Sequence, residues 1–77
     1  MTPEQWLTRR VKESGIRQRF IVAKSGIDDF TENRLSFSLN GRRRIRVDEF
    51  LAVCRVIGAN PMEYLENLDA KGEAASA

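Results

Sequence analysis

The sequence predicts a single all-α domain, a compact bundle of about five short helices. Apolar residues recur at spacings of three and four, and capping residues open segments that glycines close. No useful stretch alternates apolar and polar residues as a strand does. With 77 residues the chain has room for one domain, which we place at residues 1–70, before a flexible tail at 71–77.

The first two helices are bounded by capping residues and glycines. Thr2 suits the N-cap and Pro3 the first helical position, so the first helix begins here and ends at Gly15. The second runs from about residue 17 to 24 or 25 and ends at Gly26. Helices this short are marginal alone, so packing must stabilise them.

The third helix has two possible starts. Either Thr31 or Asp29 can be its N-cap, and the helix ends at Gly41. Leu35 and Leu39 lie one turn apart and are its expected apolar anchors.

The fourth helix has the strongest periodicity, and Gly58 ends it. Its expected core face consists of Val47, Phe50, Leu51, Cys54 and Ile57. We interpret Cys54 as a buried free thiol. A fifth helix opens with Asn60 as cap and Pro61 in the first position.

Composition excludes several classes of function. With no histidine and one cysteine, the chain cannot form an internal disulfide, the usual zinc sites or a histidine-dependent nucleophile. We expect no enzyme, no metal, no cofactor and no small-molecule ligand. No apolar run is long enough to span a membrane, and residues 1–10 contain no signal-peptide core, so we expect a cytoplasmic protein.

The net charge of +2 conceals a strong asymmetry. Residues 1–8 carry −1, residues 9–46 carry +7 and residues 47–77 carry −4. A basic half beside an acidic half indicates a polyanionic partner on one side, although a solvated basic face would look the same.

Residues 11–65 resemble the lambda-repressor-like helix-turn-helix domains, the Cro-repressor type of phage and bacterial regulators. Three segments carry the resemblance: Gly15 to Ile27, Arg34 to Gly41 with its Leu-Asn-Gly ending, and Val47 to Leu65. In this family the second and third helices form the DNA-binding pair. The chain departs from the pattern in a turn about three residues longer, Asp28 to Phe30, in a serine at position 38, and in Arg46 where Ser or Thr is common.

The resemblance implies that the third helix reads bases in the major groove. With Thr31 as cap and a possible phosphate contact, the candidate base-facing residues are Glu32, Asn33, Arg34, Ser36 and Phe37. Each has a plainer interpretation. Asn33 and Ser36 can be ordinary surface residues. Arg34 can bind phosphate or pair with Glu32 or Asp29. Phe37 can fill the core or a dimer contact. Glu32 can serve only the helix dipole.

Further basic residues are candidates for phosphate contacts, which position a protein on DNA without specifying sequence. They are Arg17, Gln18 and Arg19 at the start of the second helix, and Arg42, Arg43 and Arg44 after the third. The resemblance gives Gln18 an additional bracing role against the third helix. The three consecutive arginines can also be a solvated loop.

Proteins of this family usually bind two half-sites as dimers. The apolar residues that could form a dimer contact are Val53, Val56, Met62, Tyr64 and Leu68. The sequence therefore predicts a sequence-specific transcriptional regulator, a small homodimeric repressor of bacterial or phage origin that occupies double-stranded DNA at a dyad-symmetric operator. The alternatives are a protein-interaction module, such as an antiactivator or adaptor, and an antitoxin-type autorepressor.

Overall fold

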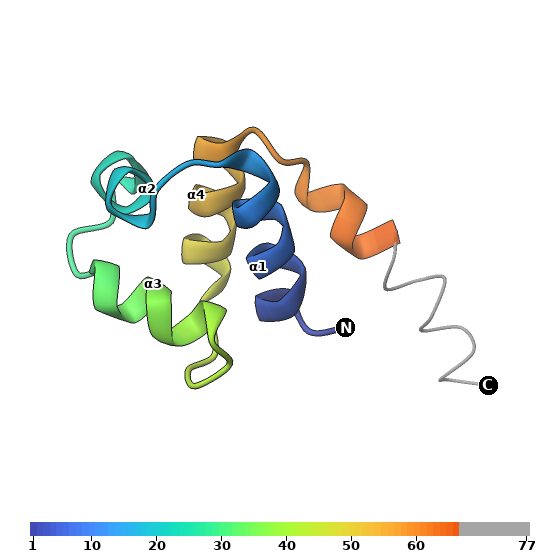
Figure 1. Ribbon diagram of the computed structural model, residues 1–77, viewed down its shortest axis with the longest axis horizontal. Coiled ribbons are helices and arrows are strands. Elements are labelled where there is room, and N and C mark those ends of the chain that lie inside the picture. The colour runs from blue at the N-terminus through green and yellow to red at the C-terminus, as the bar shows by residue number, and fades with distance from the viewer. Residues whose placement is uncertain (67–77) are drawn as a thin grey trace.

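Four helices and a shorter helical segment make up the part of the chain that the computed structural model describes, residues 1–66. These are α1 (Pro3–Ser14), α2 (Gln18–Ser25), α3 (Glu32–Leu39) and α4 (Val47–Ile57), followed by helical residues 61–66 (Figure 1). The predicted all-α class with five helices is confirmed, and residues 1–66 contain no strand.

The helix ends that capping residues predict agree with the structure for α1 and α2. Thr2 Oγ1 accepts a hydrogen bond from the Gln5 backbone N–H at 3.1 Å, and Gln5 Oε1 accepts one from the Thr2 N–H at 3.0 Å. Gly15 and Gly26 follow α1 and α2 with φ of 71° and 76°, in the left-handed region that glycine enters without strain. These signals place α1 and α2 where the sequence predicts them.

The core lies where α1, α2 and α4 meet over α3. α4 packs against both α1 and α2, and α3 packs against the same two helices. In Figure 1, α4 runs through the middle of the molecule, with α1 on one side and α2 on the other. The buried cluster comprises Trp6, Leu7, Val11, Ile21, Phe30, Leu35, Val53 and Cys54.

The expected core face of α4 is partly wrong. Cys54 is buried and Phe50 and Ile57 pack against the core, but Val47 is 75% exposed and Leu51 is 48% exposed. The fully buried side chains of α4 include Glu49 and Val53 instead. α4 carries apolar residues around most of its circumference, so periodicity alone does not decide which of them face inward.

Candidate nucleic-acid interface

α2 and α3 are consecutive helices that pack on each other and are joined by residues 26–31. Ile21 of α2 and Leu35 of α3 are fully buried in the shared core. The connection contains the three additional residues noted in the sequence. Phe30 within it is only 3% exposed, and its N–H donates to the Ile27 carbonyl at 3.3 Å. The long connection is therefore anchored in the core.

The start of α3 is capped and exposes three polar side chains. Thr31 Oγ1 accepts a hydrogen bond from the Arg34 backbone N–H at 3.1 Å, so Thr31, not Asp29, is the N-cap. Glu32, Asn33 and Arg34 occupy the first turn and are all exposed. Side chains in this position can reach a ligand without rearrangement of the helix.

Asp29 lies beside two arginines. Its Oδ2 is 3.6 Å from Arg34 Nη1 and 3.8 Å from Arg46 Nη1, and the three side chains are about half exposed. Between the two partners considered for Arg34, the structure selects Asp29 over Glu32. Exposed pairs at this distance contribute about 0–1 kcal/mol, so Arg34 can exchange Asp29 for another acceptor at little cost.

The second turn of α3 alternates between solvent and core. Ser36 is partly exposed and Phe37 is 49% exposed, which excludes a core-filling role for Phe37. Ser38 is completely buried although it is polar. The face that carries Phe37 is thus the face that carries Asn33 and Arg34, around the exposed side of α3.

α2 begins close to the start of α3. Arg17 is the N-cap of α2 and its side chain makes no capping hydrogen bond, while Gln18 is the first helical residue. A hollow of about 680 Å³ is lined by Lys12, Arg17, Gln18, Arg19 and Glu32 together with three apolar or glycine neighbours. The structure thus brings the predicted residues of α2 to the same hollow as the first residue of α3, and Arg17 and Arg19 are exposed there.

The three consecutive arginines of the arginine loop, residues 40–46, differ in their exposure to solvent. Arg42 and Arg44 are exposed. Arg43 turns inward, where Nη1 and Nη2 donate to the two carboxylate oxygens of Glu49, each at 2.9 Å, and Nη1 also donates to Ser38 Oγ at 3.0 Å. Arg43 therefore differs from its two neighbours, because its guanidinium is held by an internal carboxylate and its side chain is only 25% exposed.

This ion pair is electrostatically well matched. Burial alone raises the pKa of the Glu49 carboxyl, but hydrogen bonds from Arg43 and from the Arg46 backbone N–H outweigh burial, so the pKa lies below its usual value. The hydrogen bond to Glu49 raises the pKa of Arg43 in turn. Both groups are therefore charged at neutral pH.

Two contacts from α1 hold the arginine loop and the last residue of α3 before it. The Ile45 backbone N–H donates to Glu4 Oε2 at 2.8 Å, and Thr8 Oγ1 donates to the Leu39 carbonyl at 2.7 Å. Sequence patterns place none of Glu4, Thr8, Ser38 and Glu49 in the candidate site. The only available signals were a serine in place of an apolar residue at position 38 and a carboxylate on the apolar side of α4.

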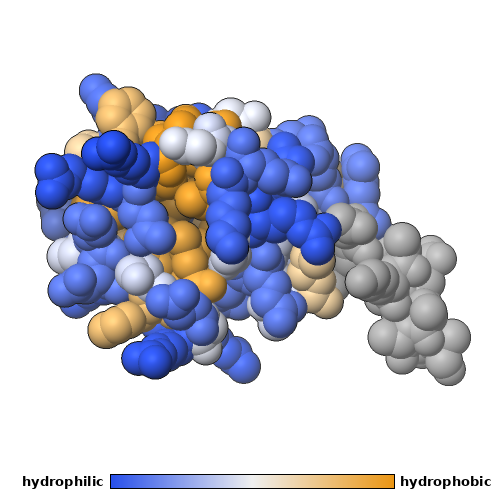
Figure 2. Space-filling model, viewed as in Figure 1, coloured by the Kyte–Doolittle hydropathy of each residue, from blue (hydrophilic) through white to orange (hydrophobic). Residues whose placement is uncertain are grey.

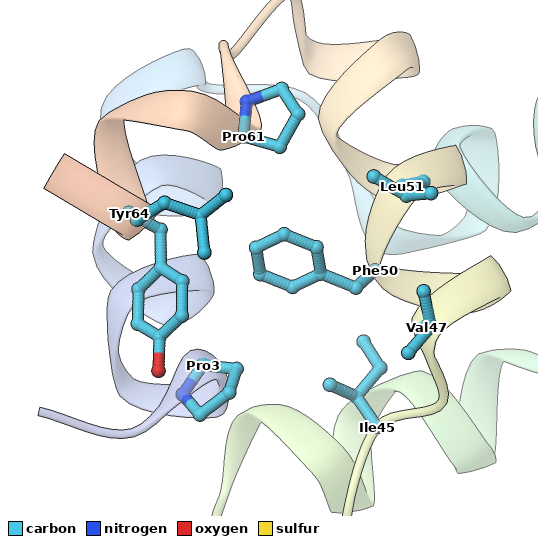
Figure 3. A pocket seen from close by; sticks show the side chains of 8 residues that line it. Pro3, Ile45, Val47, Phe50, Leu51, Pro61 and Tyr64 are labelled. Atoms are coloured by element: carbon cyan, nitrogen blue, oxygen red, sulfur yellow. The ribbon is translucent and has the colours of Figure 1, made fainter. Parts of the chain in front are cut away.

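An apolar cleft of about 270 Å³ lies on another part of the surface (Figure 3). Its lining consists of Pro3, Ile45, Val47, Phe50, Leu51, Pro61, Tyr64 and Leu65. Figure 3 shows α4 residues on one side and Tyr64 on the other, with the Phe50 ring between them. Phe50, Tyr64 and the buried Trp6 form a cluster with ring centroids 5.7 Å apart in each pair.

The predicted dimer residues do not form one surface. Val53 is fully buried in the core, so it is not available for a dimer contact. Val56 and Tyr64 are partly buried against the core, whereas Met62 is 54% exposed. Leu68 lies outside the described residues.

Within residues 1–66, no group of three or more cysteine and acidic side chains could hold a metal ion. Burial raises the pKa of the Cys54 thiol to about 11. Among the described helices, none has the length and apolar character needed to cross a bilayer.

Comparison with known proteins identifies no relative. Neither a scan against family models nor searches of curated proteins and of solved structures find a match to this chain.

Proposed function

We propose that this protein is a sequence-specific double-stranded DNA-binding regulator, a small repressor that acts in the cytoplasm by occupying an operator. α2 and α3 would form its helix-turn-helix, with α3 in the major groove. The observation that carries the proposal is the capped start of α3, where Glu32, Asn33 and Arg34 are exposed together.

The chemistry of these side chains suits base edges. Arg34 can donate two hydrogen bonds to guanine O6 and N7, and Asn33 can pair with adenine N6 and N7. Glu32 can accept from cytosine N4, and Phe37 can contact a thymine methyl group. These residues lie on the exposed side of α3, which is the part of a helix that enters a groove.

The surroundings of α3 suit the DNA backbone. Exposed Arg17 and Arg19 flank it at the start of α2, and exposed Arg42 and Arg44 follow its end. Figure 2 shows hydrophilic residues over much of α2 and α3, with apolar residues visible beside and between them. Lysine and arginine contacts to phosphates release counterions, so we expect log K to fall with log salt at a slope of about −0.9 per phosphate contacted.

Selection of duplexes from a random DNA pool with the purified protein tests this function. We expect an enriched dyad-symmetric sequence whose binding weakens steeply with salt. A protein-interaction module, by contrast, gives neither enrichment nor a salt slope on DNA. An antitoxin-type autorepressor gives the same enriched DNA and additionally co-purifies with a toxin encoded beside it.

Arg34→Ala tests whether Arg34 contacts a base of the selected sequence directly. We expect a loss of about 1–3 kcal/mol on the selected duplex and a relaxed preference at one base pair. Arg42→Ala is the matched control, since loss of a phosphate contact weakens all duplexes alike. Equal losses on selected and scrambled duplexes for both variants would exclude base reading by Arg34.

A dyad-symmetric site requires a second copy of the chain, and we propose the apolar cleft as its contact surface. Val47, Leu51 and Leu65 in the cleft lining are 45–75% exposed, and the adjacent Met62 is 54% exposed. Exposed apolar patches of this kind mark interaction surfaces. The patch involves far fewer than the roughly 20–30 residues per side of a standard interface, so we expect a weak dimer that forms on DNA.

Leu51→Gln should therefore abolish cooperative binding of two copies while leaving affinity for a single half-site unchanged. The change is neutral in charge and replaces a half-exposed side chain, so the fold should keep its stability. Phe20→Gln on α2 is the matched control, because Phe20 is equally exposed but lies outside the cleft. Band-shift titrations on one-half-site and two-half-site duplexes measure both quantities, and unchanged cooperativity in Leu51→Gln would exclude the cleft.

A further inference from the structure

Glu49 is a fully buried carboxylate in the first turn of α4. Its Oε1 accepts hydrogen bonds from Arg43 Nη1 at 2.9 Å and from the Arg46 backbone N–H at 3.0 Å, and its Oε2 accepts one from Arg43 Nη2 at 2.9 Å. Arg43 Nη1 also reaches Ser38 Oγ at 3.0 Å. One carboxylate thus joins the end of α3, the arginine loop and the start of α4.

An ion pair with a buried carboxylate is an inefficient means of stabilising a core. Removing the Glu49 charge from water offsets much of its attraction to Arg43, whose side chain stays 25% exposed, and apolar residues of similar volume often serve as well. What a two-pronged Arg–carboxylate contact supplies is orientation, because the planar guanidinium fits the carboxylate in one way. The Arg43–Glu49 contact lies in the loop that carries the exposed Arg42 and Arg44, so it can fix the positions of these two cations.

The inward turn of Arg43 sets the positions of its neighbours. With Arg43 held inside, Arg42 and Arg44 are exposed on either side of it. The Arg42 N–H donates to the Phe37 carbonyl at 2.8 Å, and the Ile45 N–H donates to Glu4 at 2.8 Å. The loop backbone is therefore tied to α3 at Arg42, to α1 at Ile45, next to Arg44, and to Glu49 of α4 at Arg46.

We infer that Glu49 is a positioning residue for phosphodiester binding, which acts through Arg43 to hold Arg42 and Arg44 in place for the backbone of duplex DNA. This inference rests on the proposed DNA-binding function. A loop that is already ordered loses little conformational entropy on binding, and such preorganisation increases affinity.

The first experiment examines the loop without DNA. Amide hydrogen exchange of the full chain is measured for Arg42 and Ile45, whose N–H groups are bonded. Glu49→Gln and Arg43→Lys should each accelerate exchange at these amides at least about tenfold, beyond any change at core amides of α1. Exchange that rises equally everywhere would show only a loss of global stability and would overturn the inference.

The second experiment measures salt slopes on the selected duplex at a temperature at which every variant is folded by circular dichroism. The double variant Arg42→Ala, Arg44→Ala should flatten the wild-type slope by about two units. The slope of Glu49→Gln alone should already be flatter than that of the wild type. Adding Arg42→Ala and Arg44→Ala to Glu49→Gln should change the slope by less than half of the change that they cause in the wild type. An equal change of slope in the wild-type and Glu49→Gln backgrounds would overturn the inference.

Two further variants separate the explanations. Arg43→Lys preserves the charge but cannot form the two-pronged contact, so it should behave as Glu49→Gln does; wild-type slope in Arg43→Lys would indicate a direct phosphate contact instead. Glu13→Gln removes one exposed carboxylate of α1 and should leave the slope unchanged. If the wild-type chain binds no DNA while the exchange result holds, the proposed function fails and the loop anchor stands.

Discussion

Two phenylalanines of the described chain show how exposure separates structural from functional residues. Phe30 in the α2–α3 connection is 3% exposed, whereas Phe37 on α3 is 49% exposed. Phe30→Ala should destabilise the protein by about 3–5 kcal/mol through cavity formation. Phe37→Ala should leave stability nearly unchanged and weaken DNA binding. Thermal unfolding and band-shift titration of both variants measure this, and equal destabilisation would contradict the assignment.

Glu49 makes stability depend on pH in the acidic range. Its pKa in the folded protein lies below the usual value, so its contribution is complete above the unfolded pKa of about 4.3 and is lost as the pH falls through the folded pKa. The free energy of unfolding should therefore decrease below about pH 4.3, and Glu49→Gln should flatten this decrease. Urea unfolding between about pH 2.5 and 7 measures it, with Glu13→Gln as an exposed control.

Individual residues were predictable where local rules govern them. Thr2 as cap follows from the sequence because capping acts over three residues, whereas the sequence leaves Thr31 and Asp29 as alternative caps of α3. Arg43 was not predictable, because neighbouring arginines are identical in sequence and only the distant Glu49 distinguishes the middle one. Glu49 lies in the first turn of α4, where a carboxylate suits the helix dipole, so the sequence alone does not reveal its tertiary partner.

At the scale of single elements, α2 is the least self-sufficient helix. Arg17 occupies its N-cap without a side-chain hydrogen bond, so its first N–H groups lack a side-chain acceptor. Arg55 of α4 compensates at the other end, where its Nη2 donates to the Ser25 carbonyl at 3.0 Å. Backbone N–H groups at an uncapped helix N-terminus, with cations beside them, can bind an anion that a capped N-terminus would bind less well.

Arg17→Ser should therefore separate stability from function. A serine cap should stabilise the protein by about 1 kcal/mol, while removal of the cation should weaken binding to all duplexes. Chemical unfolding and salt-dependent binding measure the two effects on the same sample. A variant that gains stability and keeps its affinity would remove Arg17 from the phosphate contacts.

α4 shows where element-level prediction stops. The sequence locates its ends, including Gly58 with φ of 74°, but not its rotation about its own axis. Contacts with α1 and α2 turn Val53 inward and leave Val47 and Leu51 outside. This choice depends on neighbours distant in sequence, and it creates the apolar cleft.

At the scale of the whole molecule, the charge asymmetry of the sequence follows the order of the helices. The segment with +7, residues 9–46, contains α2, α3 and most of the arginine loop, and α4 begins the acidic segment. The class of fold and the helix ends at Thr2, Gly15, Gly26 and Gly58 follow from periodicity, caps and glycines, because these signals are local. Phe30 anchors the long connection and Glu49 anchors the loop through tertiary contacts, which only the structure reveals.

The buried thiol of Cys54 has a practical consequence. Burial raises its pKa to about 11 and leaves the side chain 1% exposed, so little reactive thiolate forms at neutral pH. Oxidants and maleimide labels should therefore leave the native chain untouched. A cysteine introduced on the surface becomes the single reactive position, so cross-linking or fluorescent reporters can be placed at the cleft or on α3 without first removing the natural thiol.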